Sequence, residues 1–297
     1  MSSFNERNNR DIIKNHPCFS EEAHHKFGRI HLPVAPACNI QCKYCKRKYD
    51  CANESRPGIT SRILTPPEAL ERVRSLVERN ERLTVIGIAG PGDPLANDAT
   101  FEVFRAINRE YPELTLCVST NGLLLPDRLE ELLESGVSSL TVTINAVIPE
   151  IAEKIYSWVS YRGRQYSGKP AVDLLLENQW SGLSKAVDAG LIVKVNTVLI
   201  PGINDSEIPF IAWLAGKRGA ELMNIMPLIP KAEFEHFQRP SLEDLNIMRK
   251  KCKKYVPQMT HCKQCRADAC GEIGEDKDME LEVLLSKIGE VYNEMVV

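Results

Sequence analysis

The stretch RIHLPVAPACNIQCKYC, residues 29–45, joins an apolar segment to three closely spaced cysteines. Residues 29–36 have the composition of a buried β-strand, and Cys38, Cys42 and Cys45 lie in the loop that should follow it. Parallel α/β folds collect the ligands of their active sites in the loops at the carboxyl ends of strands. The stretch therefore predicts a first strand with a thiol-rich site at its carboxyl end.

Further along the chain, segments typical of strands alternate with segments typical of helices. The expected strands are residues 29–36, 83–90, 115–122, 139–147, 191–200 and 221–229. The expected helices are residues 66–80, 101–111, 126–136, 178–190, 206–219 and 241–255, with another in the tail from residue 277. Six strand–helix units in a row indicate a parallel sheet with crossover helices, although periodicity does not separate an open sheet from a barrel.

Composition limits the class of protein. The chain has 297 residues, 43% of them hydrophobic, and a net charge of −3 from 37 basic and 40 acidic residues. A chain so close to neutrality is not expected to bind nucleic acid. No apolar run is long enough to span a bilayer, and the polar N-terminus has no apolar core of a signal peptide. We therefore expect a cytoplasmic protein with no membrane contact.

Ten cysteines in such a chain need an explanation. Disulfides are rare in reducing compartments, so metal binding is the first hypothesis and buried core thiols are the alternative. Three thiolates on a four-iron cluster leave one iron open to a substrate, whereas a zinc site usually has four ligands in spaced pairs. The triplet Cys38, Cys42 and Cys45 favours the iron–sulfur interpretation.

The spacing of this triplet, with Tyr44 just before the third cysteine, resembles the signature of the radical S-adenosylmethionine (SAM) superfamily. The resemblance implies an α/β fold, a partial (β/α)6 TIM-like barrel with N- and C-terminal cluster-binding extensions. It also implies that the three cysteines hold a [4Fe-4S] cluster that cleaves SAM to a 5′-deoxyadenosyl radical. We expect an arm over 1–28, the barrel over 29–240 and an extension over 241–297.

The residues expected to contact SAM lie near the triplet and at strand ends. The segment 88–94 is similar to the glycine-rich segment of the superfamily, although Asp93 stands where glutamate is usual. The candidates are Tyr44, Gly90, Gly92, Asp93, Ser119, Thr120, Asn121, Asn145 and Asn196. For Asn145 and Asn196 a structural hydrogen bond is an equally good explanation.

A narrower resemblance rests on residues 16–19, 23–25, 28–36, 50–58 and 262–269, which are similar to the NifB family of nitrogenase cofactor biosynthesis proteins. Many members carry a further carrier-like domain, for which this sequence leaves no room after Val297, so a short stand-alone form is expected. The resemblance implies two further [4Fe-4S] clusters as substrates. It implies their fusion, with a SAM-derived carbide and one extra sulfur, into the 8Fe-9S-C precursor of the nitrogenase cofactor.

Six residues remain as ligands of these two clusters: Cys18, His24, Cys51, Cys117, Cys262 and Cys265. Cys262 and Cys265 share one short segment, so we group them with Cys18 at one cluster. His24, Cys51 and Cys117 then form the other group, nearer SAM, with an exchange of Cys18 and His24 between the groups as the alternative. Cys252 and Cys270 are interpreted as non-ligands.

The expected partners are an electron donor of ferredoxin or flavodoxin type, a donor of iron–sulfur clusters, and downstream cofactor carrier or scaffold proteins. Two other functions stay open at this point. One is a radical SAM enzyme that matures peptides or proteins with auxiliary clusters, which usually crowds its extra cysteines into a C-terminal extension. The other is a non-catalytic iron–sulfur scaffold or carrier, which would need no SAM contacts.

Overall fold

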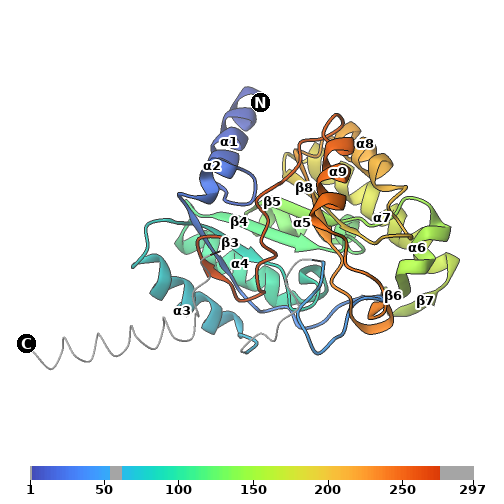
Figure 1. Cartoon of the computed structure of the whole chain (residues 1–297). Helices are drawn as coiled ribbons and strands as arrows, with labels where there is room; N and C mark the ends of the chain where they lie inside the picture. Colours follow the sequence, from blue (N-terminus) through green and yellow to red (C-terminus); the bar gives the residue numbers. More distant parts are fainter. Residues whose placement is uncertain (1, 54–61, 275–297) are drawn as a thin grey trace, which may run out of the picture.

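A computed structural model of the chain describes residues 2–53 and 62–274. The helix expected from residue 277 and part of the motif at 50–58 lie outside the described residues. The described chain forms one curved parallel sheet covered by helices, with a small second sheet beside it (Figure 1).

All six expected strand–helix units are present, which confirms the predicted fold class. The parallel strands, in spatial order, are β1 (Gly28–His31), β3 (Leu83–Ile88), β4 (Thr115–Thr120), β5 (Val137–Thr143), β8 (Ile192–Leu199) and β9 (Leu222–Pro227). The helices that follow these strands are α3 (Pro66–Val77), α4 (Asp98–Glu110), α5 (Leu125–Glu134), α7 (Lys169–Asp188), α8 (Ile208–Lys217) and α9 (Leu242–Cys252). Within the described residues β1 and β9 do not pair, so the sheet is a partial barrel.

Local sequence signals explain most of the helix limits. Thr65 and Glu68 form a capping box at the start of α3. Gly136 and Gly190 follow α5 and α7 with φ of 84° and 91°, a left-handed conformation that glycine adopts without strain. α7 begins at Lys169, nine residues before the expected helix. Pro170 lies in its first turn, a position where proline is typical of a helix start.

The main core lies between the sheet and the outer helices. Ile86, Val118 and Val142 from three strands belong to one buried cluster with Phe104 of α4 and Leu183 of α7. Cys252 and Cys270 are buried in the same cluster, a position that fits their interpretation as non-ligands.

The first strand is shorter than expected, because β1 ends at His31 and not at residue 36. Pro33 and Pro36 have no backbone N–H and so cannot continue a sheet ladder. The chain nevertheless stays beside the sheet, since the Leu32 N–H donates to the Gly87 carbonyl and Ala35 forms an isolated bridge with Pro91.

The sequence did not predict the small antiparallel sheet, which consists of β2 (Ile40–Cys42), β6 (Tyr156–Tyr161) and β7 (Arg164–Ser167). Its hairpin, β6–β7, follows α6 (Pro149–Ile155) in the chain. Arg162 and Gly163 both have positive φ, as a two-residue hairpin turn requires. β2 pairs with β6, so this hairpin holds the cysteine loop in place.

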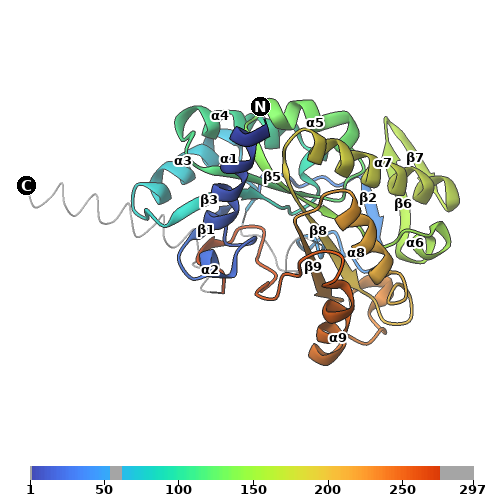
Figure 2. The same cartoon turned by 90° about the horizontal axis from the view of Figure 1, so that it is seen from above.

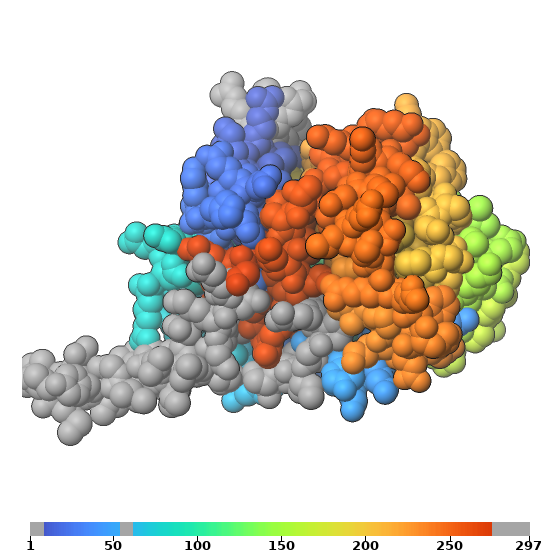
Figure 3. Space-filling view, viewed as in Figure 1, coloured from blue at the N-terminus to red at the C-terminus, as the bar shows by residue number. Residues whose placement is uncertain are grey.

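The two ends of the described chain meet on one face of the molecule. The N-terminal arm contains α1 (Ser2–Asn15) and α2 (Glu21–His24), and near the C-terminus β10 (Cys270–Gly271) pairs antiparallel with β1. The arm and the C-terminal segment lie side by side in Figures 2 and 3, and His261 Nε2 is 3.0 Å from the Pro17 carbonyl. The remaining elements are the 3-10 turns η1 (Pro94–Ala96) and η2 (Ala232–Phe234). None of the helices in the described part of the chain is long and apolar enough to span a membrane.

Candidate functional site

The three cysteines of the triplet line one cavity beyond the end of β1. Pairing of β2 with β6 fixes Cys42, and the Cys45 N–H donates to the Cys42 carbonyl at 3.0 Å. Asn53 donates to the Cys42 sulfur at 3.6 Å, and Asn121 donates to the Cys38 sulfur at 3.8 Å. Strand pairing and hydrogen bonds from Asn53 and Asn121 therefore hold the cysteine loop in position.

The donor set of this cavity fits an iron–sulfur cluster. Burial raises the pKa of Cys38, Cys42 and Cys45, so their thiolates need a bound positive charge, which iron supplies. Among the described residues, no three His, Cys, Asp or Glu side chains are arranged to hold a single metal ion. Three thiols around one cavity suit a four-iron cluster with one open iron.

Two further residues of the same cavity were not assigned to it from the sequence. Cys51 lines it together with the triplet, whereas we expected Cys51 beside His24 and Cys117. Arg47 lines it as well, and its charge acts on Cys38. Arg47 lies only two residues beyond the triplet, so proximity in the sequence was the available signal.

Tyr44 and Asn145, both predicted to contact SAM, lie in a hydrogen-bond network beneath the cysteine loop. The Tyr44 hydroxyl donates to the Asn53 side chain, and the Asn145 amide donates to the Tyr44 oxygen at 2.7 Å and to the Tyr156 oxygen at 3.1 Å. Asn145 also accepts from the Val198 N–H at 2.8 Å. These bonds give Asn145 the structural role that was the alternative to SAM contact.

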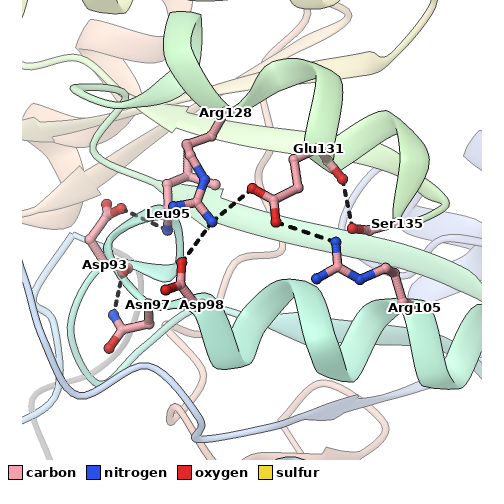
Figure 4. Close-up of polar contacts among 8 residues, drawn as sticks. All are labelled: Asp93, Leu95, Asn97, Asp98, Arg105, Arg128, Glu131 and Ser135. Carbon is pink, nitrogen blue, oxygen red and sulfur yellow. Dashed lines mark hydrogen bonds and ion pairs between the residues drawn. The ribbon is translucent and has the colours of Figure 1, made fainter.

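Asp93 is the buried carboxylate of the triplet cavity, with 3% of its surface exposed. It accepts hydrogen bonds from the Asn121 N–H at 2.6 Å, from the Thr120 hydroxyl at 2.9 Å and from the Leu95 N–H at 3.0 Å, the last of which is drawn in Figure 4. Burial nevertheless raises the pKa of Asp93 to about 6. The Thr120 hydroxyl thus positions the Asp93 carboxylate. That carboxylate also holds the backbone N–H of Asn121.

The glycine-rich segment packs directly on the backbone that leads to Cys38. A Cβ on Gly92 would lie 2.2 Å from the Ala37 carbonyl oxygen, so no larger residue fits there. The Gly92 N–H donates to the Ala35 carbonyl at 2.6 Å, and the Gly90 carbonyl accepts from the Ala35 N–H at 3.3 Å. Besides any contact with SAM, Gly92 therefore sets the position of the cysteine loop.

An ion-pair network fixes the helices behind this segment (Figure 4). Arg128 on α5 pairs with Asp98 at 2.9 Å and with Glu131 at 2.8 Å, and Arg105 on α4 pairs with Glu131 at 3.3 Å. The Arg128 guanidinium also lies 4.1 Å from the centre of the Phe101 ring. Helices α4 and α5 are thereby tied together next to Asp93.

A second cavity lies where the two ends of the described chain meet, and it brings Cys18, Cys262 and Cys265 together. These three residues form the group predicted from chain geometry. The predicted SAM contacts Ser119 and Asn196 line this second cavity and not the triplet cavity. The Asn196 amide donates to the Asn53 carbonyl at 3.4 Å, so the two cavities are linked through this pair.

Cys117 and His24 both lie near this second group. Cys117 alternates with the core residues of β4 and shares its inward face with Ser119. Burial raises the pKa of Cys18 to about 12, and the charges of Cys265 and Cys117 contribute to the shift. Cys117 is therefore close enough to Cys18 to interact with it.

The His24 ring centre is 5.0 Å from that of His261 in the C-terminal segment. His24 is 8% exposed, and its Nδ1 has no hydrogen-bond partner among the described residues. A buried ring nitrogen without a hydrogen-bond partner can bind a metal ion. The structure thus groups Cys18, Cys262 and Cys265, but it does not bring His24 and Cys51 to one cavity.

Comparison with protein families gives a match to the radical SAM superfamily over residues 32–214. The chain is similar to the FeMo cofactor biosynthesis protein NifB of Klebsiella pneumoniae, with 49% identity over 91% of this chain and 59% of that protein. It is 46% identical to NifB of Chlorobaculum tepidum over 93% of this chain and 66% of that protein. The chain thus spans less than two thirds of the length of these relatives.

Among solved structures, the fold is similar to that of Streptococcus suis SuiB bound to S-adenosylmethionine, with a TM-score of 0.57. The identity is 12%, and the match covers 78% of this chain and 50% of SuiB. This likeness shows that the two proteins share a barrel fold.

Proposed function

The chain belongs to the radical SAM superfamily, which uses SAM and an iron–sulfur cluster, and from its similarity to NifB proteins we propose that it acts in nitrogenase cofactor biosynthesis. The proposed reaction fuses two [4Fe-4S] clusters with a carbide derived from SAM and one extra sulfur, giving an 8Fe-9S-C precursor. Similarity to NifB proteins at 44–49% identity over about nine tenths of the chain supports this proposal.

The observation that carries the proposal is the pair of linked cavities. One is lined by Cys38, Cys42 and Cys45, and the other by a second set of three thiols. A carrier with one permanent cluster would need neither the second set nor the buried polar groups between the cavities. Two sites that share the Asn53–Asn196 contact suit an enzyme that brings SAM to a cluster substrate.

In the first cavity the triplet would hold the SAM-cleaving cluster. When bound, this cluster supplies the electron that cleaves SAM to the 5′-deoxyadenosyl radical. Asn121 and Asp93 border the same cavity and can orient SAM by hydrogen bonds. The hairpin β6–β7 and Gly92 keep the loop in the geometry that this site needs.

The two cluster substrates would be bound by the remaining ligands. Cys18, Cys262 and Cys265 would hold one of them in the second cavity. His24, Cys51 and Cys117 are the ligands proposed from the sequence for the other, although Cys51 lines the triplet cavity. Three protein ligands for each cluster leave irons exposed, which suits substrates that must rearrange and a product that must leave.

Location and partners follow from the same proposal. In the part of the chain that the structure describes, none of the ten cysteines forms a disulfide, which fits the reducing cytoplasm where we place the protein. SAM cleavage needs an electron donor of ferredoxin or flavodoxin type. The substrates need an iron–sulfur cluster donor, and the product needs a carrier or scaffold protein of nitrogenase assembly.

The test is anaerobic turnover of the fully reconstituted protein with SAM labelled in its methyl group and a strong reductant. We expect both S-adenosylhomocysteine, from methyl transfer, and 5′-deoxyadenosine, from radical formation, with the label retained in the cluster product. Formation of neither would indicate a scaffold. 5′-Deoxyadenosine formation that requires an added peptide would indicate a peptide-maturing enzyme.

A further inference from the structure

A buried lysine lies among the groups that line the second cavity. Lys194 is on β8, every residue of which is buried, and only 7% of Lys194 is exposed. Lys194 and Asn196 are two residues apart on β8, so their side chains point to the same face of the sheet. Both residues line the cavity. Burying an ammonium group is costly unless negative charge lies close by.

The surroundings of Lys194 show where its charge acts. Its Nζ lies 5.5 Å from the centre of the Phe19 ring, on the N-terminal arm. Lys194 therefore faces the place where the arm and the C-terminal segment carry Cys18 and Cys262.

The ionisable acids in the lining of this cavity are thiols: Cys18, Cys262 and Cys265. Three thiolates around a four-iron core carry a net negative charge, and this charge increases when the cluster takes up an electron. A fixed ammonium beside such a cluster stabilises it, and it stabilises the reduced form more than the oxidised form.

We propose that Lys194 is the counter-charge of the cluster substrate bound by Cys18, Cys262 and Cys265. It is a positioning residue that retains this cluster and favours its reduced state. The proposal rests on the proposed function, because it takes a cluster to be the occupant of the cavity. For charges about 10 Å apart in a medium of intermediate polarity, loss of one charge changes the ratio of reduced to oxidised cluster about tenfold.

The test compares Lys194→Met, which removes the charge, with Lys194→Arg, which keeps it. Lys263→Met is the matched control, because Lys263 lines the same cavity but is exposed to solvent that screens its charge. Each full-length protein is reconstituted anaerobically, its iron is counted, and its clusters are titrated with reductant and followed by EPR. The signal of this site is the one that disappears in the Cys262→Ala/Cys265→Ala double variant.

In Lys194→Met we expect either loss of about four irons or, where the cluster is retained, an about tenfold lower ratio of reduced to oxidised cluster at a fixed potential. In Lys194→Arg the iron content and the ratio of reduced to oxidised cluster should stay within about twofold of those of the unmodified protein. Lys263→Met should change both quantities less than Lys194→Met does. Should Lys194→Met fail to fold, Lys194→Gln takes its place in the same titration.

Unchanged iron content together with an unchanged ratio in the charge-removing variant would overturn the role of Lys194. The proposed function itself would be overturned if the Cys262→Ala/Cys265→Ala variant had the same iron content and the same EPR signals as the unmodified protein. No cluster would then occupy the cavity.

Discussion

Cys18 and Cys265 line the same cavity, although they come from opposite ends of the described chain. The contact of His261 with the Pro17 carbonyl and the pairing of β10 with β1 bring their segments together. His31 strengthens the junction, because its Nδ1 lies 3.0 Å from the Arg266 carbonyl. The second cavity thus depends on the N-terminal arm and on the C-terminal segment at once.

Removing Cys262 and Cys265 together should empty this cavity and spare the triplet. The Cys262→Ala/Cys265→Ala variant should still cleave SAM and form S-adenosylhomocysteine, but it should not form the eight-iron product. The measurements are quantification of both SAM products and EPR of the cluster product. Loss of methyl transfer with retention of the other cluster would reverse our division of the ligands.

Full anaerobic reconstitution should give about twelve irons per chain, as three four-iron clusters. The basis is the triplet together with six further candidate ligands. Iron and acid-labile sulfide analysis, with spin quantification by EPR, measures this directly. A plateau near four irons with all ten cysteines intact would exclude both substrate sites.

Cys45→Ala should abolish SAM cleavage without removing the cluster substrates. Only two thiols of the triplet would remain in its cavity, while the other candidate ligands are untouched. We expect no 5′-deoxyadenosine and a loss of about four irons. Cys252→Ala is the control, because Cys252 is buried in the main core and should affect stability alone. Normal 5′-deoxyadenosine formation by Cys45→Ala would contradict the assignment.

Gly92→Ala should destabilise the protein by more than about 3 kcal/mol and impair the triplet cluster, because the new Cβ would collide with the Ala37 carbonyl. The control is Gly202→Ala, where the new Cβ would meet no atom within 4 Å outside the adjacent residues and only a positive φ of 77° opposes the change. Its cost should be about 1–2 kcal/mol. Urea unfolding of the cluster-free proteins and iron counts after reconstitution would measure both effects.

Asp93→Asn should change how stability depends on pH. Burial raises the pKa of Asp93 from 3.8 to about 6, so between these values the folded protein binds more protons than the unfolded chain. The cluster-free protein should therefore lose stability relative to the variant as pH rises from about 4 to about 6, by on the order of 3 kcal/mol, and no further above that range. Urea unfolding of both proteins across this range is the measurement, and a difference that does not vary with pH would disprove the shift.

Much of the fold could be predicted because its signals are local. Apolar runs that end in glycine or proline located the six parallel strands, and the capping residue Thr65 located the start of α3. The small sheet β2–β6–β7 was missed, although the positive-φ turn at Arg162 and Gly163 leaves a weak signal in the sequence. Its strands are short, and β2 pairs with a segment more than a hundred residues away.

The sequence by itself determined the strand–helix order and the spacing of Cys38, Cys42 and Cys45, because both depend on neighbours along the chain. Only the tertiary structure decided which distant groups share a cavity. It placed Cys51 beside the triplet and Lys194 beside the second group of thiols. The physical reason is that these contacts arise from the curvature of the sheet and from the packing of the N-terminal arm against the C-terminal segment of the described chain, which no local pattern encodes.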